Sequence, residues 1–400
     1  MRVNFCSPAA DFGGAEVHML CLIEASRARA RQVDVTIQDL PGLEPLVSAV
    51  ERLGATLRPA AVAWDWTAPS QDNVRRQGQA FEQVLDQAPP DLVVVSLPWP
   101  NYGLGALRAC MARDVPTIAV FHLAAADHAL ERDEIEGMRD VHAAGQLWVA
   151  VSPGVQSAVA AMVGVPKQRI PVISNGVSIP CAPSQPEIVG LRARIRRELG
   201  FEEDARLVLT VARLDPQKGH FDLLAALPRI LDAIPQARFA WLGEGPVRVE
   251  LESAARAINA KGKVLAITGH VDNVDPFYWA CDAFVLPSYL EGHSLALLEA
   301  AAHGCAIVTT SIQQDRLLRP QSNVLLHRPG DLVDLAEHVV RILGDGGFAS
   351  RIGAGARAWA SAHSITGMIE NYERLVQAHC QRWSRLVGAA EAAAVSYPRN

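Results

Sequence analysis

Two segments in the second half of the sequence place charged side chains where a diphosphate could bind. In the first segment, Arg213 and Lys218 follow the apolar run Leu207–Val211 and precede Gly219. An arginine can donate two parallel hydrogen bonds to phosphate oxygens, and a lysine supplies a mobile point charge. The spacing therefore predicts a diphosphate site at the end of a strand. The structural alternative is two solvated cations in a turn.

The second segment, PSYLEGHSLALLEAAAHG, holds Glu291 and Glu299 eight residues apart. Ser294 suits the N-cap of an apolar helix, and the free N–H groups at a helix start attract anions. We expect Glu291 to contact the hydroxyl groups of a sugar and Glu299 to contact a second group, such as a ribose. The anion would bind the backbone of Gly292, His293, Ser294 and Leu295. The alternative is that both glutamates only complement the helix dipole.

The first half of the chain offers a glycine pair and a histidine, each after a strand-like run. Gly13 and Gly14 follow the run Val3–Phe5, so a phosphate or sugar could approach their backbone N–H groups. His122 follows the run Thr117–Phe121, where an imidazole could contact a sugar or a developing charge. Each also has a structural reading, because loops often contain glycine pairs and histidines often pack at strand ends. The glycine segment matches neither GxGxxG nor the P-loop motif.

Short apolar runs that alternate with amphipathic segments must position these residues. The alternation predicts β-α-β crossovers and parallel sheets covered by helices on both faces. The expected strands are Val3–Phe5, Val33–Ile37, Leu92–Ser96, Thr117–Phe121, Leu147–Val151, Leu207–Val211, Phe239–Leu242, Val264–Thr268, Ala283–Leu286 and Ala306–Thr310. The expected helices are Glu16–Ala28, Glu44–Leu53, Val74–Leu85, Val155–Val163, Leu223–Ile234, Val247–Asn259, Leu295–His303 and Leu332–Leu343.

The length of 400 residues, half of them hydrophobic, predicts two α/β domains, each with its own core. An Asn-Gly pair followed by three prolines between residues 180 and 186 suits a linker, with the boundary near 178–187. We expect an N-terminal Rossmann-like domain over 1–177, a second over 188–364, and a C-terminal helix over 365–386. The Ala-rich end from residue 388 is expected to fray. Two doubly wound domains would face each other across a cleft and bind ligands at the carboxyl ends of their strands.

Charge and cysteine content exclude several classes of protein. The net charge of −6 argues against nucleic acid as the main partner. Two Arg-rich stretches, 27–31 and 192–197, read as solvated helix faces, with attraction to anionic lipid as the alternative. Seven scattered cysteines without a CxxC pair favour free thiols over disulfides or a zinc site. Without a signal-peptide pattern or a long apolar run, we expect a cytoplasmic protein, with peripheral contact at the inner membrane face left open.

Taken together, these segments resemble glycosyltransferase family 4. VARLDPQKG is similar to the family pattern V-G-R-L-x-x-x-K-G, and PSYLEGHSLALLEAAAHGCAIVTT is similar to the family segment with the E-x7-E pair. Weaker similarities include GGAE near the start and VISNGV at the linker. The likeness extends from about residue 3 to residue 386. It implies the two-domain GT-B fold and retaining transfer from a nucleoside-diphosphate sugar, without a metal or other cofactor.

The resemblance also implies roles for individual residues. Arg213 and Lys218 would hold the donor diphosphate, Glu291 the transferred sugar and Glu299 the nucleotide ribose, while Gly14 would approach the diphosphate and His122 would line the transfer site. The final helix would cross back onto the first domain. The acceptor would be a sugar or a lipid-linked sugar.

Departures from the family pattern leave the substrates open. His293 and Ser294 stand where the family has an aromatic residue and glycine, and Ala212 replaces a glycine. After Thr310, SIQQDRLL replaces the common Gly-Gly-x-x-Glu pattern. Sugar, base, acceptor and oligomeric state therefore stay open. Alternative functions are a sugar-nucleotide epimerase or phosphorylase on a related frame, or a non-catalytic glycosyltransferase-like partner subunit. An acceptor could stack on aromatic side chains of the first half, or these could pack in the core: Trp64, Trp66, Trp99 and Tyr102.

Overall fold

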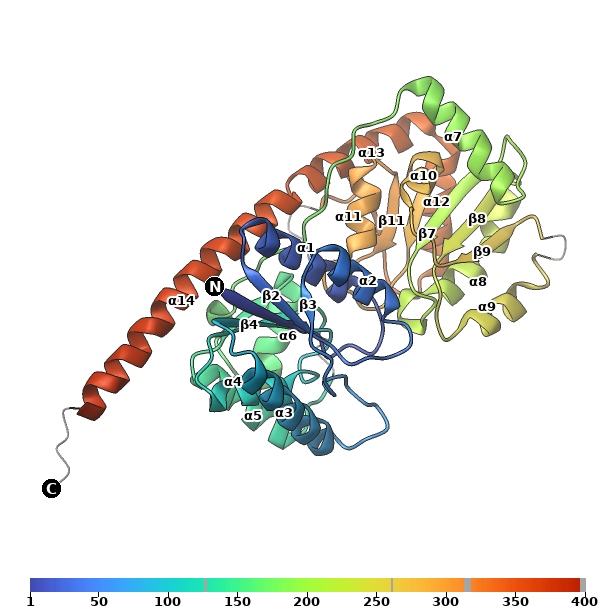
Figure 1. Cartoon of the computed structure of the whole chain (residues 1–400). Helices are drawn as coiled ribbons and strands as arrows, with labels where there is room; N and C mark the ends of the chain where they lie inside the picture. Colours follow the sequence, from blue (N-terminus) through green and yellow to red (C-terminus); the bar gives the residue numbers. More distant parts are fainter. Residues whose placement is uncertain (126–127, 260–261, 313–317, 396–400) are drawn as a thin grey trace. The chain divides into compact units, whose positions relative to one another are not determined.

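The computed structural model in Figure 1 describes residues 1–125, 128–259, 262–312 and 318–395, with side chains described up to residue 385. The chain divides into two compact units, Met1–Asn175 with Ile365–Asn400, and Gly176–Ser364. Each unit contains a six-stranded sheet. Parallel pairing joins all neighbouring strands in both sheets. The expected α/β class with two doubly wound Rossmann-like domains is confirmed.

The sheet of the first unit has the strand order β3-β2-β1-β4-β5-β6, so the order reverses between β1 and β4. Its strands are β1 (Arg2–Cys6), β2 (Gln32–Thr36), β3 (Thr56–Leu57), β4 (Leu92–Leu97), β5 (Thr117–Phe121) and β6 (Leu147–Ala150). Its helices are α1 (Gly14–Ala28), α2 (Glu44–Arg52), α3 (Ser70–Gln87), α4 (Leu104–Ala112), α5 (Arg132–Ala143), α6 (Pro153–Val163) and α14 (Ile365–Val395). The short 3-10 helix η1 (Lys167–Arg169) follows α6.

The sheet of the second unit has the order β12-β11-β10-β7-β8-β9 and reverses between β7 and β10. Its strands are β7 (Arg206–Val211), β8 (Ala237–Leu242), β9 (Leu265–Gly269), β10 (Ala283–Leu286), β11 (Ile307–Thr310) and β12 (Leu325–His327). Its helices are α7 (Gln185–Glu198), α8 (His220–Ala233), α9 (Arg248–Ala255), α10 (Asp275–Ala280), α11 (Leu295–Ala302), α12 (Leu332–Gly344) and α13 (Gly346–Ser361). The 3-10 helix η2 (Pro216–Lys218) precedes α8.

The central strands are almost entirely apolar because both of their faces are covered. Every residue of β4 (LVVVSL) and of β10 (AFVL) is buried. Strands buried on both faces lose the alternation of polar and apolar residues, which is why these runs could be recognised in the sequence. The bounds of β5 and β10 agree with the predicted strands.

Helix α14 completes the core of the first unit, although it follows the second unit in the chain. Met368, Tyr372 and Val376 are buried in the same apolar cluster as β1 and β4. Arg31 donates two hydrogen bonds to the carboxylate of Glu373, at 2.8 and 2.6 Å. The helix continues to Val395, so the expectation that the chain frays from residue 388 is wrong for residues 388–395, and residues 396–400 lie outside the described residues. The alanines of this segment have high helix propensity, which favours continuation of the helix.

The proline-rich segment read as a linker belongs to the second unit. That unit begins at Gly176, earlier than the predicted start at residue 188. The N–H of Val177 donates to the carbonyl of His363 at 2.9 Å, which pairs the two ends of the unit. Helix α7 starts at Gln185 with Ser184 as N-cap and a proline in its first turn. A proline is well tolerated at this position, so it marked a helix start and not a linker.

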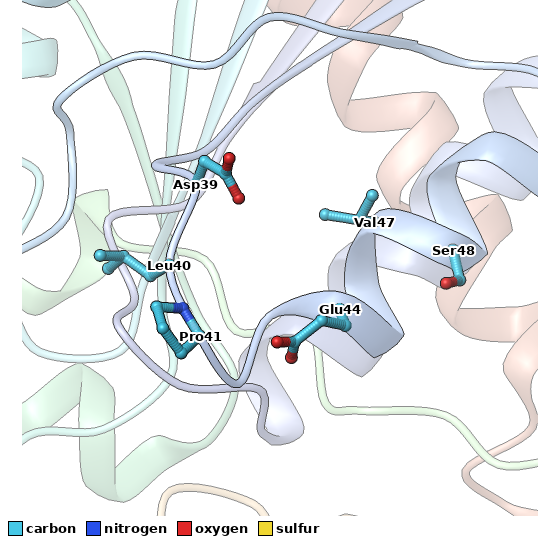
Figure 2. A pocket seen from close by; sticks show the side chains of 6 residues that line it. All are labelled: Asp39, Leu40, Pro41, Glu44, Val47 and Ser48. Atoms are coloured by element: carbon cyan, nitrogen blue, oxygen red, sulfur yellow. The ribbon is translucent and has the colours of Figure 1, made fainter.

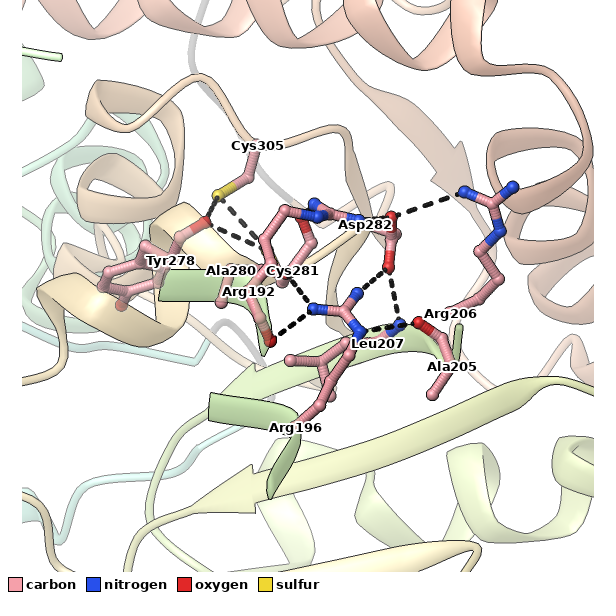
Figure 3. Close-up of polar contacts among 10 residues, drawn as sticks. All are labelled: Arg192, Arg196, Ala205, Arg206, Leu207, Tyr278, Ala280, Cys281, Asp282 and Cys305. Carbon is pink, nitrogen blue, oxygen red and sulfur yellow. Dashed lines mark hydrogen bonds and ion pairs between the residues drawn. The ribbon is translucent and has the colours of Figure 1, made fainter. Parts of the chain in front are cut away.

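Asp282, the residue before β10, anchors α7 to the sheet (Figure 3). Its carboxylate accepts hydrogen bonds from Arg196 Nη2 at 2.8 Å and from the N–H of Leu207 at 2.7 Å. Arg192 also pairs with it, and Arg206 lies at 3.8 Å. Arg196 is 2% exposed. The expectation that residues 192–197 form only a solvated face is therefore wrong for Arg192 and Arg196.

The substitution Asp282→Ala is expected to destabilise the protein by about 3–5 kcal/mol, because it leaves the buried guanidinium of Arg196 without its carboxylate. Urea unfolding would measure this loss. Arg206→Ala is the matched control, since it removes an exposed partner of the same carboxylate and should cost less than about 1 kcal/mol. Equal losses in the two variants would show that the carboxylate does not support α7.

Candidate active site

The structure brings the two charged segments together at the point where the strand order of the second sheet reverses. The loop 212–219 follows β7, and the loop 287–294 follows β10; the two strands are neighbours. In doubly wound sheets, ligands bind outside the carboxyl ends of the strands at this switch point. The sequence-predicted residues of the second half therefore share one edge of one sheet.

Backbone contacts hold the two loops side by side. The N–H of Tyr289 donates to the carbonyl of Gln217 at 2.8 Å, and the Gln217 side-chain amide donates to the carbonyl of Leu290 at 2.8 Å. Gly219 has a φ of +72°, and a Cβ at this position would lie 2.0 Å from the carbonyl oxygen of Pro287. Only glycine allows this close approach in this conformation.

Lys218 and Glu291, 73 residues apart in the chain, form an ion pair at the meeting point of the loops. Lys218 Nζ lies 2.8 Å from Glu291 Oε1, and the hydroxyl of Ser288 donates to the same oxygen at 2.7 Å. The side chains of Lys218 and Glu291 are 18% and 8% exposed. Arg213 is more exposed and pairs with Asp215 at 3.4 Å. The site thus holds two cations, with one of them fixed against a largely buried carboxylate.

The predicted start of the helix beside this ion pair is confirmed. Helix α11 begins at Leu295, and the hydroxyl of Ser294 accepts a hydrogen bond from the N–H of Leu297 at 3.3 Å. Gly292 lies in the turn before the N-cap. The imidazole of His293 is largely buried, and its ring centroid lies 5.2 Å from that of His363. The turn carrying Glu291 therefore leads directly into a capped helix N-terminus.

Glu299 lies on the second turn of α11, where only part of its side chain reaches the surface. The hydroxyl of Tyr278 donates to Glu299 Oε2 at 3.0 Å. Burial raises the pKa of the Glu299 carboxyl, and the hydrogen bond from Tyr278 opposes this shift. Burial together with the Glu299 charge holds the pKa of Tyr278 well above 10, so the phenol remains a donor at neutral pH.

The glycine pair of the first unit lies after β1, at the switch point of that sheet. Gly13 is the N-cap of α1, and Gly14 is the first residue of the helix. The N–H of Gly13 donates to Glu16 Oε2 at 3.0 Å, and the hydroxyl of Ser7 donates to Glu16 Oε1 at 2.8 Å. The N–H of Gly13 is therefore already bonded within the protein.

His122 follows β5 in the first unit and is buried. Its Nε2 lies 3.0 Å from the hydroxyl oxygen of Ser96, and its ring centroid lies 4.9 Å from that of His18. Burial, and then the proximity of His18, hold the pKa of His122 well below 6.5, and burial lowers the pKa of His18 to about 4. Both imidazoles are therefore neutral at pH 7, so His122 can exchange hydrogen bonds but carries no charge.

Of the aromatic side chains suggested for an acceptor, two pack against each other. Trp64 and Tyr102 stack with their ring centroids 5.0 Å apart and are buried. Trp66 contacts Tyr102 edge-on and is 69% exposed. Core packing therefore accounts for Trp64 and Tyr102, and the indole of Trp66 is open to solvent.

An open pocket of about 410 Å³ in the first unit contains none of the predicted site residues (Figure 2). It is lined by Asp39, Leu40, Pro41, Glu44, Val47 and Ser48. Its two charged side chains are carboxylates, which repel a diphosphate. The site is therefore defined by the switch points and not by this pocket.

Sequence reasoning missed the polar side chains that hold the predicted ones: Ser7, Glu16, His18, Ser96, Tyr278 and Ser288. Ser288 could have been found, because it stands three residues before Glu291 in the same turn. Most of the segment that replaces the Gly-Gly-x-x-Glu pattern, residues 313–317, lies outside the described residues. Within the described parts of the chain, no cluster of three His, Cys, Asp or Glu side chains could hold a metal ion. Over the same parts, no helix has the length and apolar character needed to cross a membrane.

Comparison with known families matches both units. Residues 12–179 match the model of Glycosyltransferase Family 4, and residues 205–345 match that of Glycosyl transferases group 1. A glycogen synthase of Mycobacterium tuberculosis is 30% identical over 269 residues, 63% of this chain and 60% of that protein. An uncharacterized glycosyltransferase of Methanocaldococcus jannaschii is 29% identical over 210 residues, 51% of this chain and 52% of that protein. The chain thus spans about half the length of the curated relatives it matches.

Solved structures share the fold at low sequence identity. The Anabaena protein HepE, solved in complex with UDP-glucose, is 18% identical and has a TM-score of 0.78 over 94% of this chain and 100% of that one. A glycosyltransferase from Rickettsia africae is 14% identical, with a TM-score of 0.77 over 94% of this chain and 98% of that one. With two matching family models, this fold and the E-x7-E segment at the switch point, the chain belongs to glycosyltransferase family 4 and has the GT-B fold.

Proposed function

We propose that the protein is a retaining glycosyltransferase. It would move a sugar from a nucleoside-diphosphate sugar to a hydroxyl group of a glycan, lipid-linked sugar or small molecule during glycan or glycoconjugate biosynthesis. The observation that carries this proposal is the convergence of Lys218, Glu291 and the N-terminus of α11 at the switch point of the second sheet.

The donor would bind mainly to the second unit. Lys218 and Arg213 would neutralise the diphosphate together with the N–H groups at the start of α11. Glu291, held by Lys218 and Ser288, would accept hydrogen bonds from hydroxyls of the transferred sugar. Glu299 would accept them from the ribose. The complex of HepE with UDP-glucose supports a sugar nucleotide as the class of donor.

Catalysis would come from stabilising the leaving group. Cleavage of the bond between the anomeric carbon and the diphosphate oxygen leaves negative charge on the diphosphate. Lys218 and Arg213 would bind this charge more strongly in the transition state than in the ground state. The departing phosphate oxygen would take the proton of the acceptor hydroxyl, and the sugar would transfer on the same face. The two cations would serve in place of a metal, so we expect transfer to continue in EDTA.

On the first unit, His122 would contact the sugar or the acceptor hydroxyl through hydrogen bonds, because its imidazole is neutral. Gly14 would bring the start of α1 towards the diphosphate. Peripheral contact with a membrane would follow if the acceptor were lipid-linked.

Thermal unfolding in the presence of UDP, GDP and ADP tests the donor site first. A nucleoside diphosphate at 100 times its dissociation constant should stabilise the protein by about 2.7 kcal/mol. Hydrolysis of the matching nucleotide sugars without acceptor would then identify the sugar. Failure of all three nucleotides to stabilise the protein would contradict the proposal. Release of an epimerised nucleotide sugar would instead indicate an epimerase.

A further inference from the structure

We infer that Tyr278 is a positioning residue for nucleotide recognition, and that it acts by orienting Glu299 and keeping its carboxylate ionised. This inference rests on the proposed function, because it assigns a determinant of affinity to the same donor site. It concerns a side chain that contacts the carboxylate from the core and not from the ligand side.

The hydroxyl of Tyr278 has one proton and two acceptors within reach. Glu299 Oε2 lies at 3.0 Å and the carbonyl oxygen of Ala296 lies at 3.4 Å. The carboxylate is both the nearer and the charged acceptor, so it takes the proton. This contact occupies Oε2 and orients the carboxylate, which leaves Oε1 to accept a hydroxyl of the ligand.

The phenol cannot move away from Glu299, because its ring and its backbone are both fixed. Tyr278 is 2% exposed, and its ring lies against Phe284 and His303, with centroids 5.8 and 4.9 Å away. Its carbonyl oxygen accepts hydrogen bonds from the thiols of Cys281 and Cys305 at 3.3 and 3.4 Å, as Figure 3 shows. The donor is therefore preorganised in a dry environment, where a hydrogen bond to a charge is strong.

The other charged groups around Glu299 do not supply this stabilisation. Asp275 on α10 raises the pKa of the Glu299 carboxyl, as burial does. His303 follows α11 and pairs with Asp275 at 3.2 Å; burial lowers the pKa of this imidazole. Arg357 on α13 donates a hydrogen bond to the carbonyl of Ala302, and its charge lowers the pKa of the His303 imidazole. Tyr278 is thus the group that opposes protonation of Glu299.

The ionisation of Glu299 should make nucleotide affinity depend on pH. An ionised Glu299 accepts hydrogen bonds from ribose hydroxyls more strongly than a protonated one. Nucleotide affinity should fall as the pH decreases through the raised pKa of Glu299. Removing the Tyr278 hydroxyl raises this pKa further, so the loss of affinity should begin at a higher pH.

A double-mutant cycle tests the inference. The dissociation constants of UDP, GDP and ADP would be measured by calorimetry between pH 5 and 8 for Tyr278→Phe, Glu299→Gln, the double variant and the natural chain. For the nucleotide that binds, Tyr278→Phe should weaken binding by on the order of tenfold at pH 7. It should also move to higher pH the acid limb of the affinity profile, which is the pH range where affinity falls as the pH decreases. The ionisation of the nucleotide phosphate is common to all four proteins and cancels in the comparison.

The remaining variants separate positioning from simple structural support. In the Glu299→Gln background, Tyr278→Phe should change affinity little, because there is no carboxylate to orient. Tyr372→Phe is the matched control, since it removes a buried tyrosine hydroxyl in the core of the first unit, and it should leave the acid limb unchanged. If Tyr278→Phe does not fold, the test is Glu299→Gln alone, which should flatten the part of the acid limb that comes from the protein.

The results that would contradict the proposed function differ from those that would contradict only the role of Tyr278. Absence of binding by all three nucleotides to the natural chain would overturn the proposed function and this inference with it. Normal nucleotide binding with the same affinity and the same acid limb in Tyr278→Phe would overturn the inference alone. Equal losses from Tyr278→Phe with and without Glu299 would also overturn it, because the tyrosine would then act independently of the carboxylate.

Discussion

Replacing Lys218 with alanine is expected to lower the turnover of sugar transfer by about 10²–10³-fold while the protein remains folded. The ammonium group would act on charge that develops as the bond to the diphosphate breaks, so its loss should reduce kcat and kcat/KM by similar factors. Steady-state kinetics with the identified donor would measure both. Lys263→Ala is the matched control, since Lys263 is 60% exposed and lies before β9, in another part of the second unit.

The same substitution removes the cation that pairs with Glu291, and among the described contacts Ser288 then remains as its hydrogen-bond partner. The resulting loss in the free energy of unfolding must be separated from the loss of catalysis. Urea unfolding of Lys218→Ala, with and without Glu291→Gln, would do so. Neutralising the glutamate should recover stability but not turnover. A rise in KM with unchanged kcat would contradict a transition-state role, because it would mean that Lys218 binds the ground state equally well.

Gly219→Ala is expected to abolish nucleotide binding and to destabilise the second unit. A Cβ there would lie 2.0 Å from the carbonyl oxygen of Pro287, so the loops after β7 and β10 would have to separate. The positive φ alone costs an alanine about 1–2 kcal/mol. The clash adds to this cost, so urea unfolding should show a larger loss, and calorimetry should show no binding of the nucleotide that the natural chain binds.

Gly200→Ala distinguishes the clash from the backbone conformation. Gly200 has a φ of +75°, close to that of Gly219, but apart from its own residue and its two chain neighbours no described residue has an atom within 4 Å of the position of its Cβ. This control should lose only the 1–2 kcal/mol of the positive φ and should keep nucleotide binding. If the two alanine variants were equally stable and both bound nucleotide, the loops would not need their close contact.

The parts of the fold that the sequence predicts best are those where local pattern and tertiary environment agree. β5 and β10 could be placed because their residues are buried on both faces and therefore form continuous apolar runs. Ser294 could be placed because N-capping is a local interaction. The start of helix α7 was missed, although residues 192–197 were read as a helix face, because the preceding prolines were taken as linker residues and one of them stands in the first turn of the helix.

Most supporting contacts of the site could not be predicted, because they join residues far apart in the chain. Tyr278 and Glu299 meet across 21 residues, and Ser96 and His122 across 26. Nothing in the local pattern distinguishes a tyrosine that donates to a buried carboxylate from one that only fills space. The pairing of Lys218 with Glu291 depended on strand order, which is a property of the whole sheet.

The chain order of the two units determines when each can be completed during synthesis. The second unit is inserted within the first, since residues 176–364 separate α14 from the rest of its core. A nascent chain that has emerged as far as Asn175 therefore exposes the apolar surface that Met368, Tyr372 and Val376 will cover. The ends of the inserted unit are joined by the hydrogen bond between Val177 and His363, so this unit can fold first. Most of the first unit is thus synthesised early, but α14 is synthesised only after the second unit. Premature termination before α14 would leave the core of the first unit incomplete.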